Sequence, residues 1–458
     1  MAAKTVAKKR YTFKNLISDI VARYKQTGNV DIFFLLTLLG LLSLGLVMMF
    51  SASYPSALEE GESPAFYIIK QGIGAVIGLF FMYLFSKTDA DIFKNKNIAK
   101  AIVIGSYALL VIVLIVNRGK SIKRWIDLGP IGFQPSELSK FAIVLIGALL
   151  YAKFYKRMSS SKVFSVGKIG ELNVKVYKHF AAQGKNIYLH EGWIPTVQHV
   201  AFFVTTAGFV ALGSHLSAFI IMFLLGGVMM FLGKVRVRWF ALALALVVLV
   251  LCVVCIPIKI TVNEKNELLA SGEISNSAEA DQYVLDNVKI PFIKGYQVKR
   301  IISWIDKDYS PRGDRWQQNQ GLYAIGSGGL TGKGLGNSTL KYQYVSEPHN
   351  DMIFTIVCEE LGFLGAVFVI LAFTFFVYRG MKIGMNARTR FKSYFAMGLT
   401  LLLGLQALLN IAVATEVIPN TGISLPFFSY GGTALMVHLA EAGIILSISR
   451  DSRISKAG

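Results

Sequence analysis

The sequence predicts an all-α polytopic membrane protein with about ten transmembrane helices and a large extracellular loop between helices 7 and 8. Hydropathy is the first observation, because 54% of the 458 residues are hydrophobic and the mean hydropathy is +0.53. Charge is the second, since a net charge of +20 is typical of membrane proteins that collect Lys and Arg in cytoplasmic loops. No nucleic-acid partner is expected, because the basic residues are scattered through short loops between apolar runs.

Ten apolar segments reach or approach the length of about 20 helical residues that a hydrocarbon core of ~30 Å requires. They are residues 32–52, 66–86, 98–117, 136–155, 197–215, 217–233, 239–259, 351–379, 394–418 and 427–449. No small-residue cleavage site cleanly follows the first segment, so we expect a retained helix and not a signal peptide.

The distribution of Lys and Arg predicts how these helices are oriented. The N-terminal arm 1–30, the loop 156–196 and the tail 450–458 are basic, and all fall on one side of a ten-helix protein. We therefore expect both termini in the cytoplasm and the large loop 260–350 outside. Within the cytoplasmic loop, the alternation in KVFSVGKIGELNVKVY suggests a small hairpin.

Positive charge also occurs in two loops that should face outward. Arg118, Lys120, Lys123 and Arg124 follow the third helix, and residues 289–341 hold nine Lys and Arg against three Asp and Glu. Such charge either binds an anionic ligand, for example a phosphate, or contacts lipid headgroups and acidic loop residues. The sequence leaves both interpretations open.

The stretch RWIDLGPIGFQPSELSK, residues 124–140, carries the first group of candidate site residues. The Gln-Pro-Ser-Glu run from Gln134 to Glu137 is typical of a helix start. Glu137 and Lys140 are spaced i, i+3 and can pair, either to position a polar group inside the bundle or as a simple interfacial ion pair. Trp125 is either an interfacial anchor or a wall for a sugar ring.

Two further segments lie in the predicted outer loop. Residues 296–320 contain apolar residues at helical spacing, which favours an amphipathic helix on the membrane surface, with Lys299 and Arg300 near headgroups or a diphosphate. The glycine-rich loop 326–336 resembles a phosphate-binding loop only superficially. Lys333 is followed by glycine where a P-loop needs Ser or Thr, so a nucleotide site is rejected.

Asp351 is the strongest single candidate, because it lies where a polar loop becomes a long apolar helix and is costly to desolvate there. It could act as a general base, as a cation ligand or as a helix cap. His349 is expected to hydrogen-bond within its loop, and Glu359 or Glu360 to pair inside the bundle. Pro and paired Gly in residues 420–433 predict a helix break that lines a cavity.

Together these residues resemble the SEDS family of peptidoglycan polymerases. The matching pieces are RWIDLGPIGFQPSELSK, YQVKRI, the glycine loop, SEPHNDMIFTIVCEELGFLG and LPFFSYGGTAL, in that order. They cover roughly residues 118–140 and 296–449, and the ten-helix layout extends the likeness over residues 31–449. The form Phe-Phe-Ser-Tyr-Gly-Gly-Thr and the long basic N-terminus favour a division-type member of the family.

The resemblance implies a glycosyltransferase that moves glycan from lipid II to a nascent strand at the outer face of the bacterial cytoplasmic membrane, in cell division or cell-shape maintenance. Asp351 occupies the position of the family's essential aspartate, and Glu137 and Lys140 match its paired residues. The resemblance also implies a class B penicillin-binding protein as partner, among divisome or elongasome proteins. His215 stands where the family often has Asp, so no acidic role carries over to that position.

In this chemistry Asp351 would act as the general base that accepts the proton of the attacking hydroxyl, and undecaprenyl diphosphate would be the leaving group. The expected substrate-binding residues are Lys123, Arg124, Trp125, Gln134, Glu137, Lys140, Lys299, Arg300, Glu347 and His349. No cofactor is firmly implied, and a divalent cation, Mg²⁺ or Mn²⁺, could assist, although no dedicated metal cage is visible. The alternatives are a lipid II flippase or transporter, and a non-catalytic scaffold for the class B penicillin-binding protein.

Overall fold

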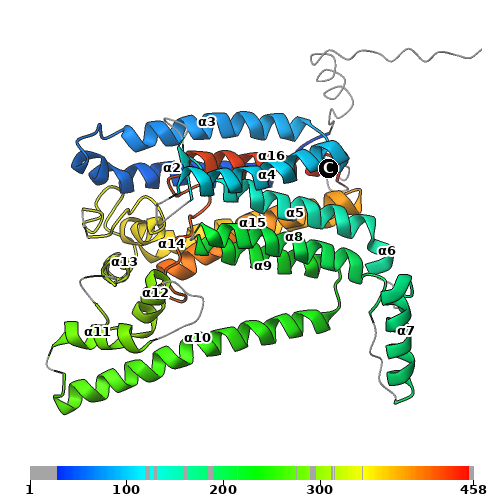
Figure 1. The fold of residues 1–458 in the computed structure, drawn as a ribbon. Coiled ribbons are helices and arrows are strands. Elements are labelled where there is room, and N and C mark those ends of the chain that lie inside the picture. Colours follow the sequence, from blue (N-terminus) through cyan, green and yellow to red (C-terminus); the bar gives the residue numbers. More distant parts are fainter. Residues whose placement is uncertain are drawn as a thin grey trace, which may run out of the picture.

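The computed structural model is all-helical apart from one hairpin of two-residue strands, β1 (Ile126–Asp127) and β2 (Gly132–Phe133) (Figure 1). The described residues are 28–118, 124–127, 132–158, 162–183, 189–213, 215–274, 276–288, 295–310, 313, 315–342 and 344–452. Side chains from 237 to 251 are largely outside this description, as is that of Asp127.

Eight helices in the described residues are long and apolar enough to span a membrane. They are α2 (Ile32–Glu59), α3 (Phe66–Lys87), α4 (Lys96–Val116), α5 (Pro135–Lys153), α8 (Trp193–Leu212), α14 (Ile353–Met385), α15 (Arg390–Ala414) and α16 (Gly432–Arg450). A shorter apolar helix, α9 (Leu216–Leu232), and the long α10 (Val237–Ser271) cover the remaining two predicted segments. The predicted class, an all-α polytopic membrane protein with about ten transmembrane helices, is therefore confirmed, and the structure has about eight to ten apolar spans.

Helices α5 and α16 form the centre of the bundle, where most of their residues are buried. Glycines allow α3 and α16 to approach closely, as is common between membrane helices. A Cβ added at Gly443 would lie 2.5 Å from the carbonyl oxygen of Met82, and one at Gly74 would lie 2.8 Å from the Cα of Gly432. The outward faces of α3 and α4 expose apolar side chains such as Phe80 and Ile104, as expected for contact with lipid.

Helix α14 is kinked at Gly362, which has φ 66° and ψ −168°. The glycine loop that follows α13 (Trp316–Ser327) supplies the backbone hydrogen bonds that the kink leaves unmade. The amides of Phe363 and Lys333 donate to Gly329 and Glu359 carbonyls at 2.9 and 3.0 Å, respectively. This loop therefore pairs with a broken helix, which explains its glycines without any phosphate ligand.

Glu359 or Glu360 was predicted to form an ion pair inside the bundle, and both do so at this kink. Lys333 Nζ lies 2.6 Å from Glu359 Oε1, and Lys341 Nζ lies 2.8 Å from Glu360 Oε1. Both glutamates are fully buried, so each needs its lysine and further donors to remain in the bundle. The hydroxyl of Ser51 on α2 donates to Glu360 at 2.6 Å and ties the first span to the kink.

The segment between α9 and α13 has its own small apolar core, built by α10, α11 (Ser277–Asn287) and α12 (Gly295–Ile305). The predicted amphipathic helix exists as α12, but its apolar face packs against protein, with Ile302 fully buried beside Ile258 and Val284. Lying on the membrane surface was therefore the wrong expectation for it. Figure 1 shows α10 set apart from α8 and α9, with α11 and α12 at its far end.

The predicted hairpin in the loop 156–196 is wrong. Its residues form the helix α7 (Gly167–Ala181), preceded by the single turn α6 (Tyr155–Met158). The one β-bridge there joins Val163 to His190. Ile169, Leu172 and Val176 recur with helical spacing, and over this length that period outweighs the short alternation at either side.

Candidate functional site

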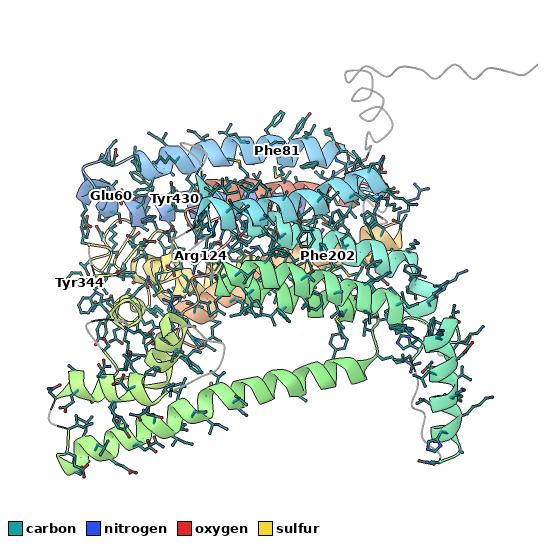
Figure 2. All side chains as sticks on the ribbon, viewed as in Figure 1. Glu60, Phe81, Arg124, Phe202, Tyr344 and Tyr430 are labelled. Carbon is teal, nitrogen blue, oxygen red and sulfur yellow. The ribbon has the colours of Figure 1, made fainter. Side chains whose placement is uncertain are left out.

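A polar cavity of about 650 Å³ opens at the end of the bundle that carries α12 and α13. Much of its wall comes from the β1–β2 hairpin with the start of α5, the start of α9, α12, the polar segment 346–351, and the loop 420–431. Residues of α3, α13 and α15 and the start of α16 complete it. Arg124 and Tyr430, which are labelled in Figure 2, line the cavity from separate parts of the chain.

Asp351 lies in this wall, just before the first turn of α14. The N-cap of α14 is Met352, and no side chain caps the helix, so Asp351 does not serve as its cap. Burial raises the pKa of Asp351 above its ordinary range, while the nearby Arg300 and Arg124 oppose that shift. A carboxyl group with a raised pKa in a cavity is suited to accept a proton.

The main chain of Asp351 is held by Asn410, a fully buried residue of α15. The Asn410 side-chain amide donates to the Asp351 carbonyl at 2.8 Å and to the Ile423 carbonyl at 2.7 Å. One side chain thus joins the candidate base to the loop 420–431. Because both bonds are short and inside the bundle, they fix the position from which the Asp351 side chain extends.

The two residues before Asp351 are held in the same way by the loop. The amide of Tyr430 donates to the His349 carbonyl at 2.8 Å, and the hydroxyl of Ser429 donates to the Asn350 carbonyl at 2.7 Å. Three successive carbonyls, those of residues 349–351, therefore each receive a hydrogen bond from α15 or the loop. We call this set the carbonyl clamp.

Gly422 brings the loop close to the side chains of Asp351 and Arg300. Its φ of +71° lies in the left-handed region that favours glycine. A Cβ at this position would lie 3.5 Å from Asp351 Oδ2 and 3.9 Å from Arg300 Nη1. The same Nη1 donates to the Asn420 carbonyl at 2.9 Å, which places the guanidinium beside the carboxylate on the cavity wall.

The inner end of the cavity is a buried ionic network. Lys140 Nζ lies 2.7 Å from Glu137 Oε2 and donates to Gln406 Oε1 at 2.7 Å. His438 Nε2 is 3.5 Å from the same Glu137 oxygen. All four side chains are buried, so the network places a paired cation and anion at the cavity floor inside the bundle.

His215 and the hairpin complete the wall. His215 Nε2 lies 3.2 Å from Gln134 Nε2, and burial, together with Arg124 and Lys140, lowers the His215 pKa to about 3. The imidazole is therefore neutral at physiological pH and adds no charge to the cavity. Trp125 is partly exposed over Gly132, so its ring forms a flat apolar part of the wall.

The structure brings together most of the residues predicted from sequence. The cavity is lined by Arg124, Trp125, Gln134, Glu137, Lys140, Arg300, Glu347 and Asp351. Lys123 lies outside the described residues. Lys299 is half-buried and does not line the cavity. The predicted break in 420–433 does line it, through Gly422, Tyr430 and Gly431 among others.

His349 is not where a substrate-binding residue would be. Its ring is buried between the rings of Tyr67, with centroids 4.5 Å apart, and Tyr430, at 5.7 Å. Its carbonyl accepts a hydrogen bond, but Nδ1 has no partner among the described residues. Direct contact of the His349 side chain with a ligand in the cavity is therefore not supported, and burial lowers its pKa.

The lining residues that the sequence reasoning did not single out include Lys70, Gln317 and Gln406. A signal existed for Lys70, because a lysine inside an apolar span marks a functional position by default. No such sequence signal existed for Gln317, because its place in the wall depends on how α13 packs. Within the described part of the chain, no group of three or more His, Cys, Asp or Glu side chains could hold a metal ion, so no step is derived through a metal.

The fold and cavity define a multi-pass membrane protein with a polar, cation-lined site at one end of a helical bundle. The model of the FtsW, RodA and SpoVE cell cycle proteins matches residues 31–454, and the chain belongs to this family. The predicted SEDS resemblance is thereby confirmed. Stage V sporulation protein E of Bacillus subtilis is 29% identical over 436 residues, covering 94% of this chain and 99% of that protein.

A second relative, named probable peptidoglycan glycosyltransferase FtsW, comes from Trichlorobacter lovleyi and is 28% identical, covering 95% of this chain and 97% of its own. Two solved structures share the fold. A chain of a peptidoglycan synthase complex has a TM-score of 0.61 at 21% identity, covering 92% and 98% of the two chains. The rod shape determining protein RodA of Thermus thermophilus has a TM-score of 0.53 at 19% identity, covering 93% and 98%.

Proposed function

We propose that this protein is a peptidoglycan glycosyltransferase that polymerises lipid II, with Asp351 as the general base. The observation that carries the proposal is the carbonyl clamp, which holds Asp351 rigidly in the wall of a polar cavity beside Arg300. Membership of the family supports it, as does the name of the Trichlorobacter relative. Preorganised placement of the base is what such a reaction needs from a protein.

In the proposed reaction, a sugar hydroxyl of one glycan attacks the anomeric carbon of another. A new carbon–oxygen bond forms, the bond from that carbon to the diphosphate breaks, and undecaprenyl diphosphate leaves with the bonding electron pair. Asp351 takes the proton of the attacking hydroxyl. With Asp351 as the general base, an activated donor and no side chain assigned as a covalent nucleophile, a single displacement is expected, which inverts the anomeric configuration. Product with the configuration retained would contradict this step.

The cations of the cavity suit the departing diphosphate. Arg124, Arg300 and Lys70 all line the cavity and come from three separate parts of the chain. Guanidinium groups match phosphate oxygens with two parallel hydrogen bonds, and positive charge stabilises the negative charge that grows on the leaving group. Lys140 is less suited to this role because Glu137 already neutralises it.

We further propose that the cavity faces outward in a bacterial cytoplasmic membrane and that both termini are cytoplasmic. The basic terminal segments and the positive-inside rule support this orientation. A class B penicillin-binding protein is the proposed partner. The support is that a chain of similar fold belongs to a peptidoglycan synthase complex that coordinates polymerisation and crosslinking. Lipid II and the nascent glycan strand are the proposed substrates, in cell division or cell-shape maintenance.

The test is polymerisation of labelled lipid II by the purified protein with its class B partner. Wild type is compared with Asp351→Asn and with the control Asp286→Asn, whose side chain is exposed on α11 far from the cavity wall. Wild type and the control should make glycan, and Asp351→Asn should make none at matched folding and monodispersity. Activity in Asp351→Asn would overturn the assigned base.

Failure of wild type under conditions where a known polymerase works would instead favour transport. One observation makes lipid flipping the second candidate: the polar network of Glu137, Lys140 and His438 continues from the cavity into the bundle, towards Glu441 on α16. Buried ionisable groups in a row are typical of translocation paths. The assay is then scrambling of fluorescent lipid II in proteoliposomes, with Glu137→Gln as the variant expected to lose it.

A further inference from the structure

Helix α7 has an unusual position in the fold. Figure 1 shows it crosswise to the membrane-spanning helices, at the end of the bundle opposite α12 and α13. The same end carries the last residues of α16. A helix that lies across the ends of the spans runs parallel to the membrane plane, at the depth where apolar core gives way to headgroups and water.

This placement is fixed by hydrogen bonds and not by a loose tether. The side-chain amide of Asn173, in the middle of α7, donates to the carbonyls of Phe164 and Leu189, both at 2.8 Å. The amide of Leu189 donates back to Asn173 Oδ1 at 2.6 Å. Gly170 packs so tightly on Ser165 that a Cβ would lie 2.2 Å from its carbonyl carbon. One face of α7 is therefore bound to the segments before and after it.

A second face of α7 is apolar, and the described part of the chain leaves much of it exposed. Ile169 is 55% exposed and Leu172 is 62% exposed, and the half-buried Val176 continues the same stripe at positions i, i+3 and i+7. Val166, directly before the helix, is 72% exposed. These are large aliphatic side chains on a helix whose other face is already packed, so water is an unfavourable surrounding for them.

The flank beside this stripe is positively charged. Lys168, Lys175 and Lys178 are exposed, and among the described residues none of them forms a salt bridge. Glu171 is the single acidic residue of α7. An apolar stripe next to unpaired lysines is the pattern of helices that lie in the interface of anionic membranes.

We propose that α7 is a membrane-surface helix that binds anionic phospholipid. The stripe of Ile169, Leu172 and Val176 enters the boundary between headgroups and acyl chains, and Lys168 and Lys175 contact the lipid phosphates. The crosswise position of α7 at the bundle end brings it to that depth. The proposal does not depend on glycan synthesis, and it rests on the proposed orientation only for assigning the leaflet to the cytoplasmic side.

The test places a fluorophore on single cysteines of the full-length protein in nanodiscs. Leu172→Cys reports the stripe, and Glu171→Cys, one residue along and facing away from it, is the matched control. Both are made after replacing Cys252, Cys255 and Cys358 with Ala. The discs contain phosphatidylglycerol or phosphatidylcholine alone, with a nitroxide on the upper acyl chain as quencher. Iodide serves as the quencher from water.

In phosphatidylglycerol discs, the nitroxide should quench the probe at 172 at least twofold more than the probe at 171, and iodide should show the reverse order. Replacing Lys168 and Lys175 with Gln should reduce the nitroxide quenching at 172 in these discs, and phosphatidylcholine discs should give the same reduction. Equal iodide quenching at both positions would overturn the proposal. A probe at 172 that neither quencher reaches would overturn it too, because a protein surface would then cover the stripe.

Discussion

Asn410→Leu should disable the protein without touching any substrate. Leucine has nearly the shape of asparagine but cannot donate, so the carbonyls of Asp351 and Ile423 both lose their hydrogen bond. The hydrogen bond to the Ile423 carbonyl is buried, whereas the one to the Asp351 carbonyl is partly buried. The Asp351 carbonyl can therefore still reach water in the cavity. At ~1–3 kcal/mol for each buried group left unpaired, we expect a loss of about 2–4 kcal/mol in stability.

The effect on turnover should exceed what the loss of stability explains. The Asp351 main chain, freed at one of three clamp points, can shift by a fraction of an ångström or more, and misplacing a catalytic group by ~1 Å can cost about 10²-fold in rate. Because Asn410 does not line the cavity and acts by holding Asp351 and the loop 420–431, kcat should fall by a larger factor than KM changes. The acid limb of the pH profile should remain, since the base itself is still present.

The assay is lipid II polymerisation with initial rates, alongside thermal unfolding of the purified protein. Asn410→Asp is the closest companion variant in shape, and it should also fail, because a carboxyl group donates at most one hydrogen bond, when protonated, where the amide donates two. Asn386→Ala is the control, since Asn386 also donates to a carbonyl but at the far end of α14. Wild-type kcat in both Asn410 variants would refute the view that the clamp positions the base.

Four further changes test other parts of the site. Arg300→Gln removes a charge that opposes the raised Asp351 pKa, so the acid limb of the pH–kcat profile should move to higher pH. Gly422→Ala should lower both the unfolding temperature and kcat, because φ is +71° and its Cβ would contact the Asp351 carboxylate. Glu441→Gln should fold like wild type, since neither carboxyl oxygen has a partner among the described residues. Glu137→Gln should lose about 3–5 kcal/mol by leaving its buried lysine unpaired.

The sequence was sufficient for features that arise within one segment. Apolar length located the spans, the Gln-Pro-Ser-Glu run located the start of α5, and i, i+3 spacing paired Glu137 with Lys140. These are local effects, so the residues that cause them lie within one or two turns of each other. The choice of Asp351 was possible for the same reason, because a polar-to-apolar boundary is visible in a single stretch.

The remaining features depend on residues that meet only through packing. Asn410 is 59 positions from Asp351 in sequence, and the kink of α14 is repaired by a loop that precedes it by about thirty residues. The spacing in one segment carries no information on such partners. α12 shows the same limit, since an amphipathic pattern indicates that one face is buried but not whether protein or lipid covers it.

The irregular backbone of the loop 420–431 helps to hold the segment that contains Asp351. Phe427 has φ +68°, a conformation that a bulky residue rarely adopts and that costs ~1–3 kcal/mol. Its ring is almost fully buried and packs edge-on against Phe376, with centroids 5.8 Å apart, which offsets that cost. The turn at this residue directs Ser429 and Tyr430 back towards the carbonyls of residues 349 and 350.

Backbone groups outside a helix are tolerated at this depth only when protein partners or a polar cavity satisfy them. Residues 349–351 meet that condition through the loop and α15, so the chain can leave helical geometry there and present a carboxylate to the cavity. The strain at Phe427 is therefore part of what positions the base. A regular helix through Asp351 would bond these carbonyls internally, and it would leave no segment to form this part of the cavity wall.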